Sequence, residues 1–233
     1  MLNQSINQSF SDIYQKYNKL TLVRFLTLIE IYHKTIKFEY MKKIGLTGGI
    51  GSGKTYVAHI LEKIGYPIYN SDKRAKELSN EHPEIKLKLK TVFGKNVYEN
   101  GNLNKSFLSD QIFASPNIRE IVNSIIHPVV REDFIAWAKK HSSHSLIFNE
   151  AAILFETKAF KTFDDNILVY APQDVKMERL LKRDQMSKET ILTKMHAQWS
   201  DSKKMSLTRH HILNDGETPL LNQIEEVLRK LHQ

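Results

Sequence analysis

Thr47-Gly48-Gly49-Ile50-Gly51-Ser52-Gly53-Lys54-Thr55 contains the pattern G-x-x-x-x-G-K-[ST] and lies between an apolar run and a helical pattern. Glycines let successive backbone N–H groups turn toward phosphate oxygens, the Lys54 ammonium reaches the terminal phosphates, and the Thr55 hydroxyl can bind Mg²⁺. The N-terminus of the following helix directs its positive end at the same anion. A chance glycine-rich turn is disfavoured because strand, loop and helix occur in the required order. The stretch predicts a nucleoside-triphosphate site with Thr55 as metal ligand, formed by Gly48, Gly49, Gly51, Ser52, Gly53, Lys54, Thr55 and Tyr56.

The chain on either side of this loop alternates between strand and helix patterns. Short apolar runs predict five strands, at 43–47, 66–70, 145–149, 166–170 and 211–213. Apolar residues at helical spacing predict helices at 57–64, 175–181, 187–198 and 220–231. Ser71-Asp72 can cap a further helix that carries Ala75 and Leu78. This order predicts an α/β fold, a P-loop NTPase-like parallel sheet flanked by helices.

Two segments are predicted to cover the sheet edge at which the loop lies. Residues 83–143 have helical patterns and no convincing core strand, which indicates a helical substrate-binding insertion over the carboxyl edge of the sheet. Within it, Asn100-Gly101 marks a turn and His127-Pro128 is predicted to interrupt a long helix. The second segment, about residues 176–205, is the predicted lid.

The composition limits the classes of function. The chain has 233 residues, 41% of them hydrophobic, and no cysteine, which excludes disulfides, thiolate metal sites and thiol catalysis. The formal net charge of +8 fits an anionic partner, and the loop favours a phosphate-bearing small molecule over nucleic acid. No apolar run approaches the length of a membrane span. Residues 1–40 form an N-terminal extension of unknown role, either without a part in the chemistry or a helix docked on the domain at 41–233.

With these pieces placed, residues 41–233 resemble the dephospho-coenzyme A kinases, the enzymes of the last step of coenzyme A synthesis. The resemblance rests on a series of short motifs in order, and not on the loop alone. The motifs are Ile44 to Thr55, Asn70-Ser71-Asp72 with Ala75, Phe93-Gly94, Ile112-Phe113, His127-Pro128, Ala152 to Glu156, Arg183-Asp184, Gln198, and Ile212 with Asn214 and Gly216. The resemblance implies transfer of the γ-phosphoryl group of ATP to the ribose 3′-hydroxyl of dephospho-coenzyme A, with Mg²⁺ as cofactor. It also implies a cytoplasmic enzyme, a monomer or small homo-oligomer, with no nucleic-acid or membrane partner.

The resemblance also suggests which side chains do the chemistry. Asp72 is the candidate base that orients the acceptor hydroxyl and accepts its proton, and an ordinary helix N-cap is the alternative. Arg179 and Arg183 share one helix face, and Arg183 matches the lid signature better, so we expect Lys54, Asp72 and Arg183 to be catalytic. Asn214 follows the last strand, where the adenine base could lie, although a plain turn explains it equally well.

Two positions depart from the resemblance, and three other groups keep open roles. Asn70 stands where the family usually carries Asp, so the first carboxylate is dispensable or metal binding is weaker. Asp201 stands where many relatives carry Arg, which suggests that the lid charge has moved to Lys203, Lys204 or Arg209. His127 is expected to shape the fold or the substrate pocket. Glu150 could serve as an outer-shell Mg²⁺ group and Glu156 as an acidic group beside the acceptor, or either could be solvated.

Two other functions remain open from the sequence. The nearest is another P-loop kinase for a small hydroxylated acceptor, which would share every argument about the ATP site. The second is a nucleic-acid-dependent ATPase or a plain binding protein, which the positive net charge motivates. A GTPase is disfavoured because Asn104-Lys105-Ser106-Phe107 lacks the final Asp of the guanine-reading motif.

Overall fold

A five-stranded parallel sheet forms the centre of the molecule. The computed structural model describes residues 41–184 and 187–233, so the predictions for residues 1–40 lie outside the described residues. The strand order is β2-β5-β1-β6-β7, and every neighbouring pair is parallel. The bounds are β1 Lys42–Gly48, β2 Ile68–Asn70, β5 Leu146–Glu150, β6 Asp165–Tyr170 and β7 His210–Leu213. The predicted α/β fold is therefore confirmed, with each strand within a few residues of its predicted place.

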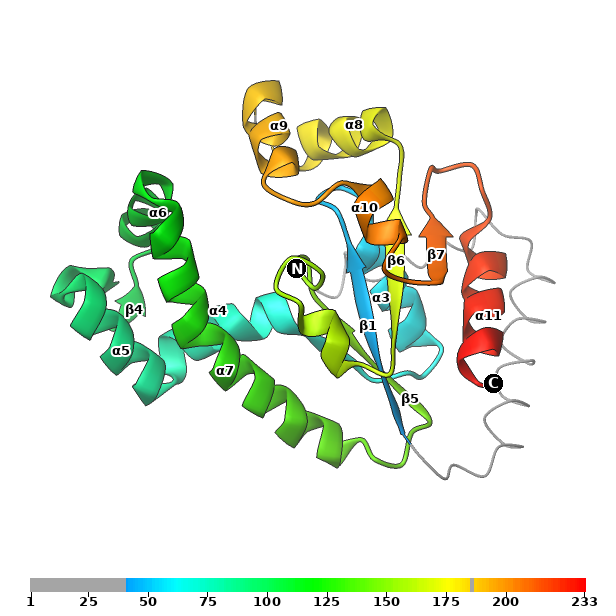
Figure 1. The fold of residues 1–233 in the computed structure, drawn as a ribbon, viewed down its shortest axis with the longest axis horizontal. Helices are drawn as coiled ribbons and strands as arrows, with labels where there is room; N and C mark the ends of the chain where they lie inside the picture. Colours follow the sequence, from blue (N-terminus) through cyan, green and yellow to red (C-terminus); the bar gives the residue numbers. More distant parts are fainter. Residues whose placement is uncertain (1–40, 185–186) are drawn as a thin grey trace.

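The main core lies between this sheet and two helices. Helix α3 (Lys54–Lys63) and the closing helix α11 (Leu220–Leu231) pack their apolar faces on one side of the sheet (Figure 1). Ile44 and Leu46 of β1 are fully buried against them. Because β1 lies between β5 and β6, the loop that follows it opens at the middle of the carboxyl edge. The fold thereby puts the phosphate-binding motif next to the ends of two other strands.

A second core holds a helical lobe beside the sheet. The lobe extends to one side of the sheet in Figure 1 and contains α4 (Ser71–Glu81), α5 (Pro83–Phe93), α6 (Lys105–Ala114) and α7 (Pro116–Lys140). Tyr69 and Ile147 connect its core to the sheet. The short antiparallel strands β3 (Tyr98–Glu99) and β4 (Asn102–Leu103) form a separate hairpin around the predicted turn, where Asn100 and Gly101 have positive φ.

Helix α7 runs without interruption through Pro128, so the predicted break at His127-Pro128 is wrong. Proline lacks the N–H that would bond to the carbonyl of Ser124, which removes one hydrogen bond of the helix. Apolar residues on both sides of Pro128 are nevertheless buried in the same core, and their packing outweighs the lost bond. They are Val122, Ile125, Val129, Val130 and Phe134.

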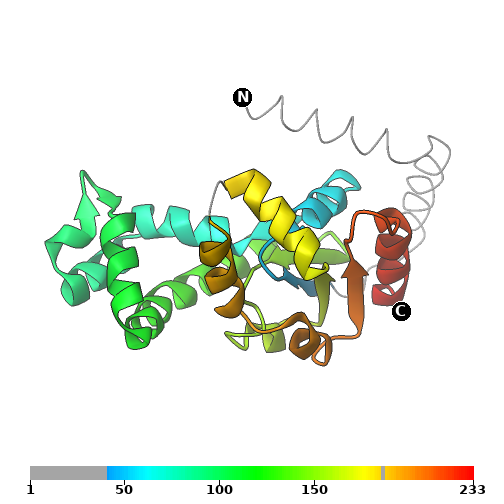
Figure 2. The ribbon, with the colours of Figure 1, turned by 90° about the horizontal axis from the view of Figure 1, so that it is seen from above.

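The helices of the predicted lid lie over the carboxyl edge of the sheet. Helices α8 (Gln173–Asp184) and α9 (Lys188–His196) cross above the strand ends, as Figure 2 shows from above. The Ser187 side chain caps α9 by accepting from the Thr190 N–H, as its sequence position predicted. The short helix α10 (Asp201–Met205) then leads to β7. Among the residues that the structure describes, no helix combines the length and apolar character needed to cross a membrane.

Candidate active site

The phosphate loop has the conformation that its glycines predict. Gly51 and Gly53 have φ of 80° and 85°, which side-chain-bearing residues rarely adopt. The Ser52 N–H donates to the Gly49 carbonyl at 3.0 Å, and α3 begins directly after Gly53. The loop therefore curls at the N-terminus of a helix, the arrangement that binds phosphate.

Glu150 lies at the centre of the site. It is 2% exposed at the end of β5, and its Oε1 accepts a hydrogen bond from the Thr55 hydroxyl at 2.5 Å. The Lys54 ammonium lies 3.4 Å from the same oxygen. Oε2 accepts from the Asn70 amide at 2.6 Å. One buried carboxylate thus joins the lysine and the threonine of the loop to the end of β2.

Asp72 lies next to this cluster and does not cap α4. The N-cap is Asn70, whose side chain accepts from the Lys73 N–H at 2.8 Å, so the capping alternative for Asp72 is wrong. Oδ2 of Asp72 lies 3.9 Å from the Lys54 ammonium and accepts from the Ala152 N–H at 3.2 Å. Burial raises the pKa of this carboxyl, although Lys54 and the Ala152 N–H act in the opposite direction. A carboxylate with a raised pKa beside a phosphate-binding lysine is suited to accept a proton.

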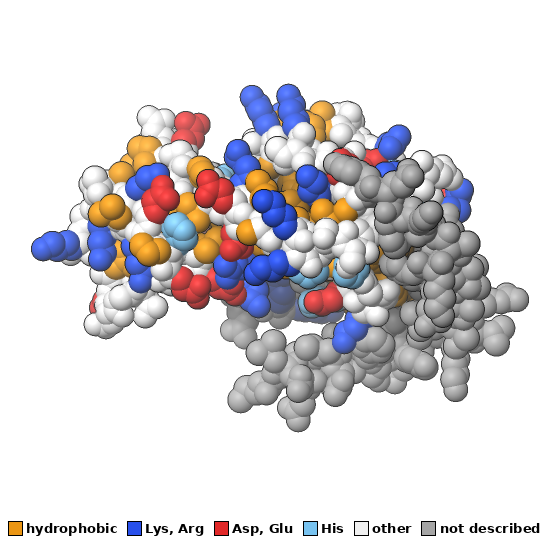
Figure 3. All heavy atoms as spheres, turned by 90° about the horizontal axis from the view of Figure 1, so that it is seen from below, with side chains coloured by type: hydrophobic (Ala, Val, Ile, Leu, Met, Phe, Trp, Pro, Cys, Tyr) orange, Lys and Arg blue, Asp and Glu red, His pale blue; other side chains and the backbone are white. Residues whose placement is uncertain are grey.

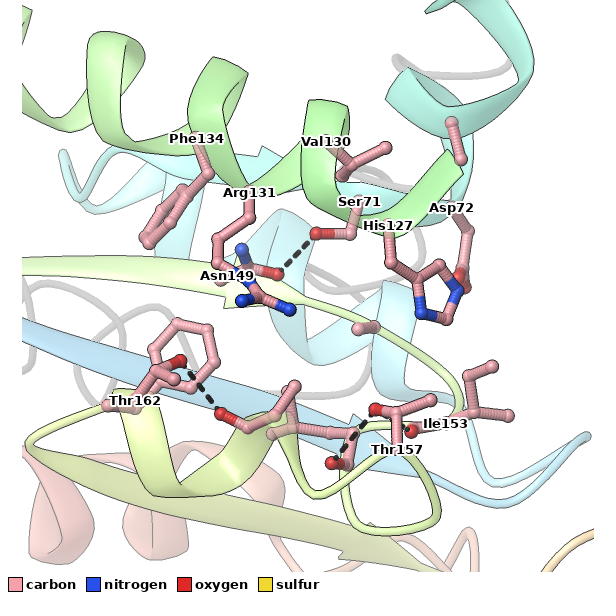
Figure 4. A pocket seen from close by; sticks show the side chains of 15 residues that line it. Ser71, Asp72, His127, Val130, Arg131, Phe134, Asn149, Ile153, Thr157 and Thr162 are labelled. Carbon is pink, nitrogen blue, oxygen red and sulfur yellow. Dashed lines mark hydrogen bonds between the residues drawn. The ribbon is translucent and has the colours of Figure 1, made fainter. Parts of the chain in front are cut away.

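A cavity of about 140 Å³ opens beside Asp72. Its lining includes Ser71, Asn149, Ala151, Phe134 and Phe163. His127 and Arg131 reach it from α7, and His127 lies close to Asp72 in Figure 4. Burial and the Arg131 charge lower the pKa of His127, while Asp72 raises it. This cavity can hold an acceptor with its reacting group at Asp72.

Arg179 lies against the phosphate loop, and Arg183 does not. The Arg179 guanidinium donates to the Gly51 carbonyl at 3.5 Å and to the Asn214 side chain at 3.3 Å. Asn214 is buried and donates to the Ser52 carbonyl at 2.9 Å, so it supports the loop from behind. The side chain of Arg183 is 64% exposed and pairs with its neighbour Asp184. The arginine of α8 that contacts the loop is therefore Arg179. It lies one helical turn before Arg183, the arginine that the sequence favoured.

The cations expected to replace an arginine at position 201 have other partners. Lys203 lies over the Trp199 ring, and Arg209 pairs with Asp165. Lys204 is fully buried with its ammonium 2.9 Å from Glu156 Oε1. Glu156 also accepts from the Trp199 N–H at 3.0 Å, and its side chain is 14% exposed, so it is not solvated and connects to the segment after α9.

Two features of the site could not be assigned from the sequence. The central position of Glu150 follows from the place of β5 between β2 and β1, and its only sequence signal is an acid at the end of a buried strand. Gln198 accepts from the Ile50 N–H at 2.8 Å across 148 positions in the chain, and no local pattern predicts that contact.

The fold and the site together define a P-loop kinase. Phosphoryl transfer to a small acceptor requires a site for the donor phosphates and an acidic group facing a separate acceptor site. The structure provides both: a phosphate loop follows the middle strand of a parallel sheet, helices lie over the carboxyl edge, and an acidic group faces a cavity.

Comparisons with known proteins identify the family. The family model for dephospho-CoA kinase matches residues 42–219. A dephospho-CoA kinase of Bacteroides fragilis is 41% identical over 191 residues, which cover 82% of this chain and 93% of that protein. One of Porphyromonas gingivalis is 38% identical and covers 81% and 93% of the two chains. The chain belongs to the dephospho-CoA kinase family and is an ATP-dependent kinase with a small-molecule substrate.

Solved structures share the fold. A crystal structure of a Thermus thermophilus protein superposes with a TM-score of 0.74 at 28% identity and covers 83% of this chain and 99% of that one. The dephospho-CoA kinase of Campylobacter jejuni shares the fold, with a TM-score of 0.56 at 20% identity over 82% and 95% of the two chains.

Proposed function

We propose that the chain transfers the γ-phosphoryl group of ATP to the ribose 3′-hydroxyl of dephospho-coenzyme A, producing coenzyme A and ADP. One observation carries the proposal: Asp72 lies 3.9 Å from the loop lysine and lines the cavity beside the phosphate loop. A carboxylate between a donor site and an acceptor cavity can orient the hydroxyl of the acceptor and accept its proton. Family membership supplies the identity of that acceptor.

In the proposed mechanism the donor phosphates bind to the loop and to Lys54. Because the transition state spreads negative charge over the transferred group, fixed N–H groups and the Lys54 ammonium stabilise it. Arg179 is suited to cover the nucleotide from α8, since it already contacts the Gly51 carbonyl. Arg183 would act only after a movement of the lid, because its side chain points to solvent with Asp184 as its partner.

The side chains around Thr55 fit a magnesium ion. Mg²⁺ prefers oxygen ligands and uses few protein groups when a nucleotide supplies phosphate oxygens. Thr55 Oγ1 and Glu150 Oε1, 2.5 Å apart, are such oxygens beside the loop. We propose that Thr55 holds the ion directly, with Glu150 behind it. Bound Mg²⁺ would neutralise charge on the donor phosphates.

Asp72 is the proposed base for the acceptor. The 3′-oxygen attacks the γ-phosphorus, the bond from that phosphorus to the bridging oxygen of ADP breaks, and the hydroxyl proton passes to Asp72. Transfer of that proton is favoured by the raised pKa of the Asp72 carboxyl. His127 and Arg131, which line the same cavity, are placed to position the acceptor.

We further propose that residues 41–233 contain the whole site, with the acceptor insertion at 83–143 and the lid at about 176–205, and that residues 1–40 are not needed for catalysis. The family match begins at residue 42, and each proposed site residue follows it. A cytoplasmic location, a monomer or small homo-oligomer, and the absence of nucleic-acid and membrane partners complete this proposal. On the face in Figure 3, Lys and Arg side chains are interspersed with acidic ones and do not form one continuous basic surface.

The deciding experiment is a coupled assay for coenzyme A formation from dephospho-coenzyme A, ATP and Mg²⁺. The wild-type chain should form coenzyme A, and Asp72→Asn should form it at least about 100-fold more slowly. A wild-type chain that phosphorylates another small alcohol instead would disprove the acceptor and keep the kinase class. Hydrolysis of ATP that polynucleotides stimulate, with salt-sensitive binding, would favour the nucleic-acid-dependent ATPase.

A further inference from the structure

Helix α8 lies along the phosphate loop and places one cationic side chain at each end of the loop. A methyl group added at Gly51 would meet the Lys176 carbonyl oxygen at 3.0 Å, so the helix backbone touches the middle of the loop. At the Gly53 end lies Arg179, which is hydrogen-bonded to Asn214. At the other end lies Lys176, whose ammonium is 3.8 Å from the Cβ position of Gly49. Residues three apart on a helix share a face, which explains how both reach the loop.

Lys176 is held at this end by Asp201. Its ammonium donates to Asp201 Oδ2 at 2.6 Å, and the two side chains are only 14% and 18% exposed. Gln198, three residues earlier, accepts from the Ile50 N–H. The segment between α9 and α10 is therefore fastened to the first half of the loop by one hydrogen bond and one ion pair.

The ammonium keeps donors available for a ligand. A lysine ammonium has three N–H donors, and among the described residues the Lys176 ammonium makes one hydrogen bond, the one to Asp201. Three other cations of the proposed lid have partners away from the loop: Arg183 pairs with Asp184, Lys203 lies over the Trp199 ring, and Lys204 pairs with Glu156. Lys176 is the lid lysine that lies beside the phosphate loop in the described part of the chain.

We propose that Lys176, beside its partner Asp201, binds the γ-phosphate of the donor nucleotide. This inference rests on the proposed binding of ATP by the loop. Arg179 and Asn214 mark the Gly53 end, where the nucleoside is expected, so the chain of phosphates extends toward Gly49 and Ile50 with its last member there. A cation at that end distinguishes a triphosphate from a diphosphate, because ADP lacks the group it contacts.

The ratio of ATP to ADP affinity tests the contact directly. Nucleotide binding is measured by calorimetry with Mg²⁺ and without acceptor for the wild type, Lys176→Met, Asp201→Asn and the double variant. Lys182→Met is the matched control, since Lys182 lies on the same helix, is 76% exposed and pairs with Glu178. We expect Lys176→Met to weaken ATP about tenfold, the effect of losing one charged hydrogen bond, and ADP less than about twofold. Asp201→Asn should tighten ATP about threefold by removing a negative charge near the phosphate.

The double variant separates the contact from simple repulsion. If Lys176 touches the γ-phosphate, the double variant remains about threefold below the wild-type preference for ATP, although no unpaired carboxylate remains. Recovery of the wild-type ratio in the double variant would overturn the proposal, because the loss would then come from an uncompensated Asp201. Equal weakening of ATP and ADP would also overturn it. Selective loss of ATP in a chain that forms no coenzyme A would uphold the contact and disprove only the acceptor. Failure of the wild type to bind either nucleotide would overturn both proposals.

Discussion

The Thr55 hydroxyl donates to Oε1 of Glu150 at 2.5 Å, which joins the last residue of the phosphate-loop motif to the end of a neighbouring strand. The Lys54 ammonium lies 3.4 Å from the same oxygen. Glu150 therefore holds both functional side chains of the loop in place.

The first prediction concerns metal dependence. Glu150→Gln keeps the shape of the side chain and removes its charge, so we expect the Mg²⁺ concentration for half-maximal activity to rise at least about tenfold and kcat to fall about 100-fold. Titration of activity with Mg²⁺ measures both. The matched control is Glu84→Gln, because Glu84 is 52% exposed on α5 and pairs only with the exposed Lys88 among the described residues. An unchanged Mg²⁺ dependence in Glu150→Gln would mean that Glu150 only supports the fold.

The second prediction concerns the pH dependence of Asp72. The pKa of its carboxyl is raised above 3.8, chiefly by burial. A base must be ionised, so kcat/KM should fall as the pH drops through this raised pKa, at a higher pH than for an exposed aspartate. Asp72→Asn should lower kcat by about 10²–10⁴-fold and abolish this acidic limb, measured as a pH–rate profile. A profile unchanged in shape would exclude Asp72 as the base.

The third prediction is that ionisation of Asp72, which activity requires, lowers the stability of the fold. A raised pKa means that the neutral carboxyl favours the folded state. The stabilisation by the neutral carboxyl is fully present below the pKa of Asp72 in the unfolded chain. It is lost as the pH rises through the pKa of Asp72 in the folded protein. At pH 7 the ionised Asp72 therefore opposes folding, and Asp72→Asn should raise Tm while it lowers kcat. The thermal unfolding of both proteins should converge near pH 3. A lower Tm for Asp72→Asn at pH 7 would contradict this linkage.

Asn70 offers a test of the missing second carboxylate. Its side chain caps α4 and donates to Glu150 Oε2 at 2.6 Å. Asn70→Asp keeps the cap but brings two carboxylates together, so we expect a lower Tm without Mg²⁺ and a larger gain in Tm on adding Mg²⁺ than in the wild type. Scanning calorimetry with and without Mg²⁺ measures the difference. Equal Mg²⁺ effects in the two proteins would place this pair outside the metal site.

Local and long-range features of this chain differ in how well they follow from sequence. The phosphate loop was predictable because its glycines, Lys54 and Thr55 are consecutive and their conformation depends on local backbone geometry. The position of Glu150 depends on sheet order, which no local pattern encodes. The predicted helix break at Pro128 was wrong because packing on both sides of the proline outweighs the hydrogen bond that it removes. The choice between Arg179 and Arg183 required the packing of α8 on the loop, since both lie on one helix face.

The two arginines make separable predictions. Arg179→Ala removes contacts to the loop carbonyl and to Asn214, so the KM for ATP should rise about tenfold with a smaller change in kcat. Arg183→Ala should lower kcat and leave the KM for ATP within about twofold if the lid closes during turnover. Steady-state kinetics at saturating acceptor resolve the two patterns. An Arg183→Ala enzyme with wild-type kinetics would show that Arg183 is a solvated surface residue.

The buried pair of Lys204 and Glu156 should matter for stability rather than for chemistry. Lys204 is fully buried on α10, and its partner follows β5, so the pair fastens the base of the lid to the sheet. Lys204→Met fills a similar space but leaves the Glu156 carboxylate without its charge partner, which should cost about 3–5 kcal/mol in the free energy of unfolding. Urea unfolding measures this loss. Adding Glu156→Gln removes the unpaired charge as well, so the double variant should recover at least about half of it. The kcat of the folded Lys204→Met variant should stay within about threefold of the wild type, because neither side chain of the pair reaches Lys54 or Asp72. A larger loss of kcat without a loss of stability would assign the pair to catalysis.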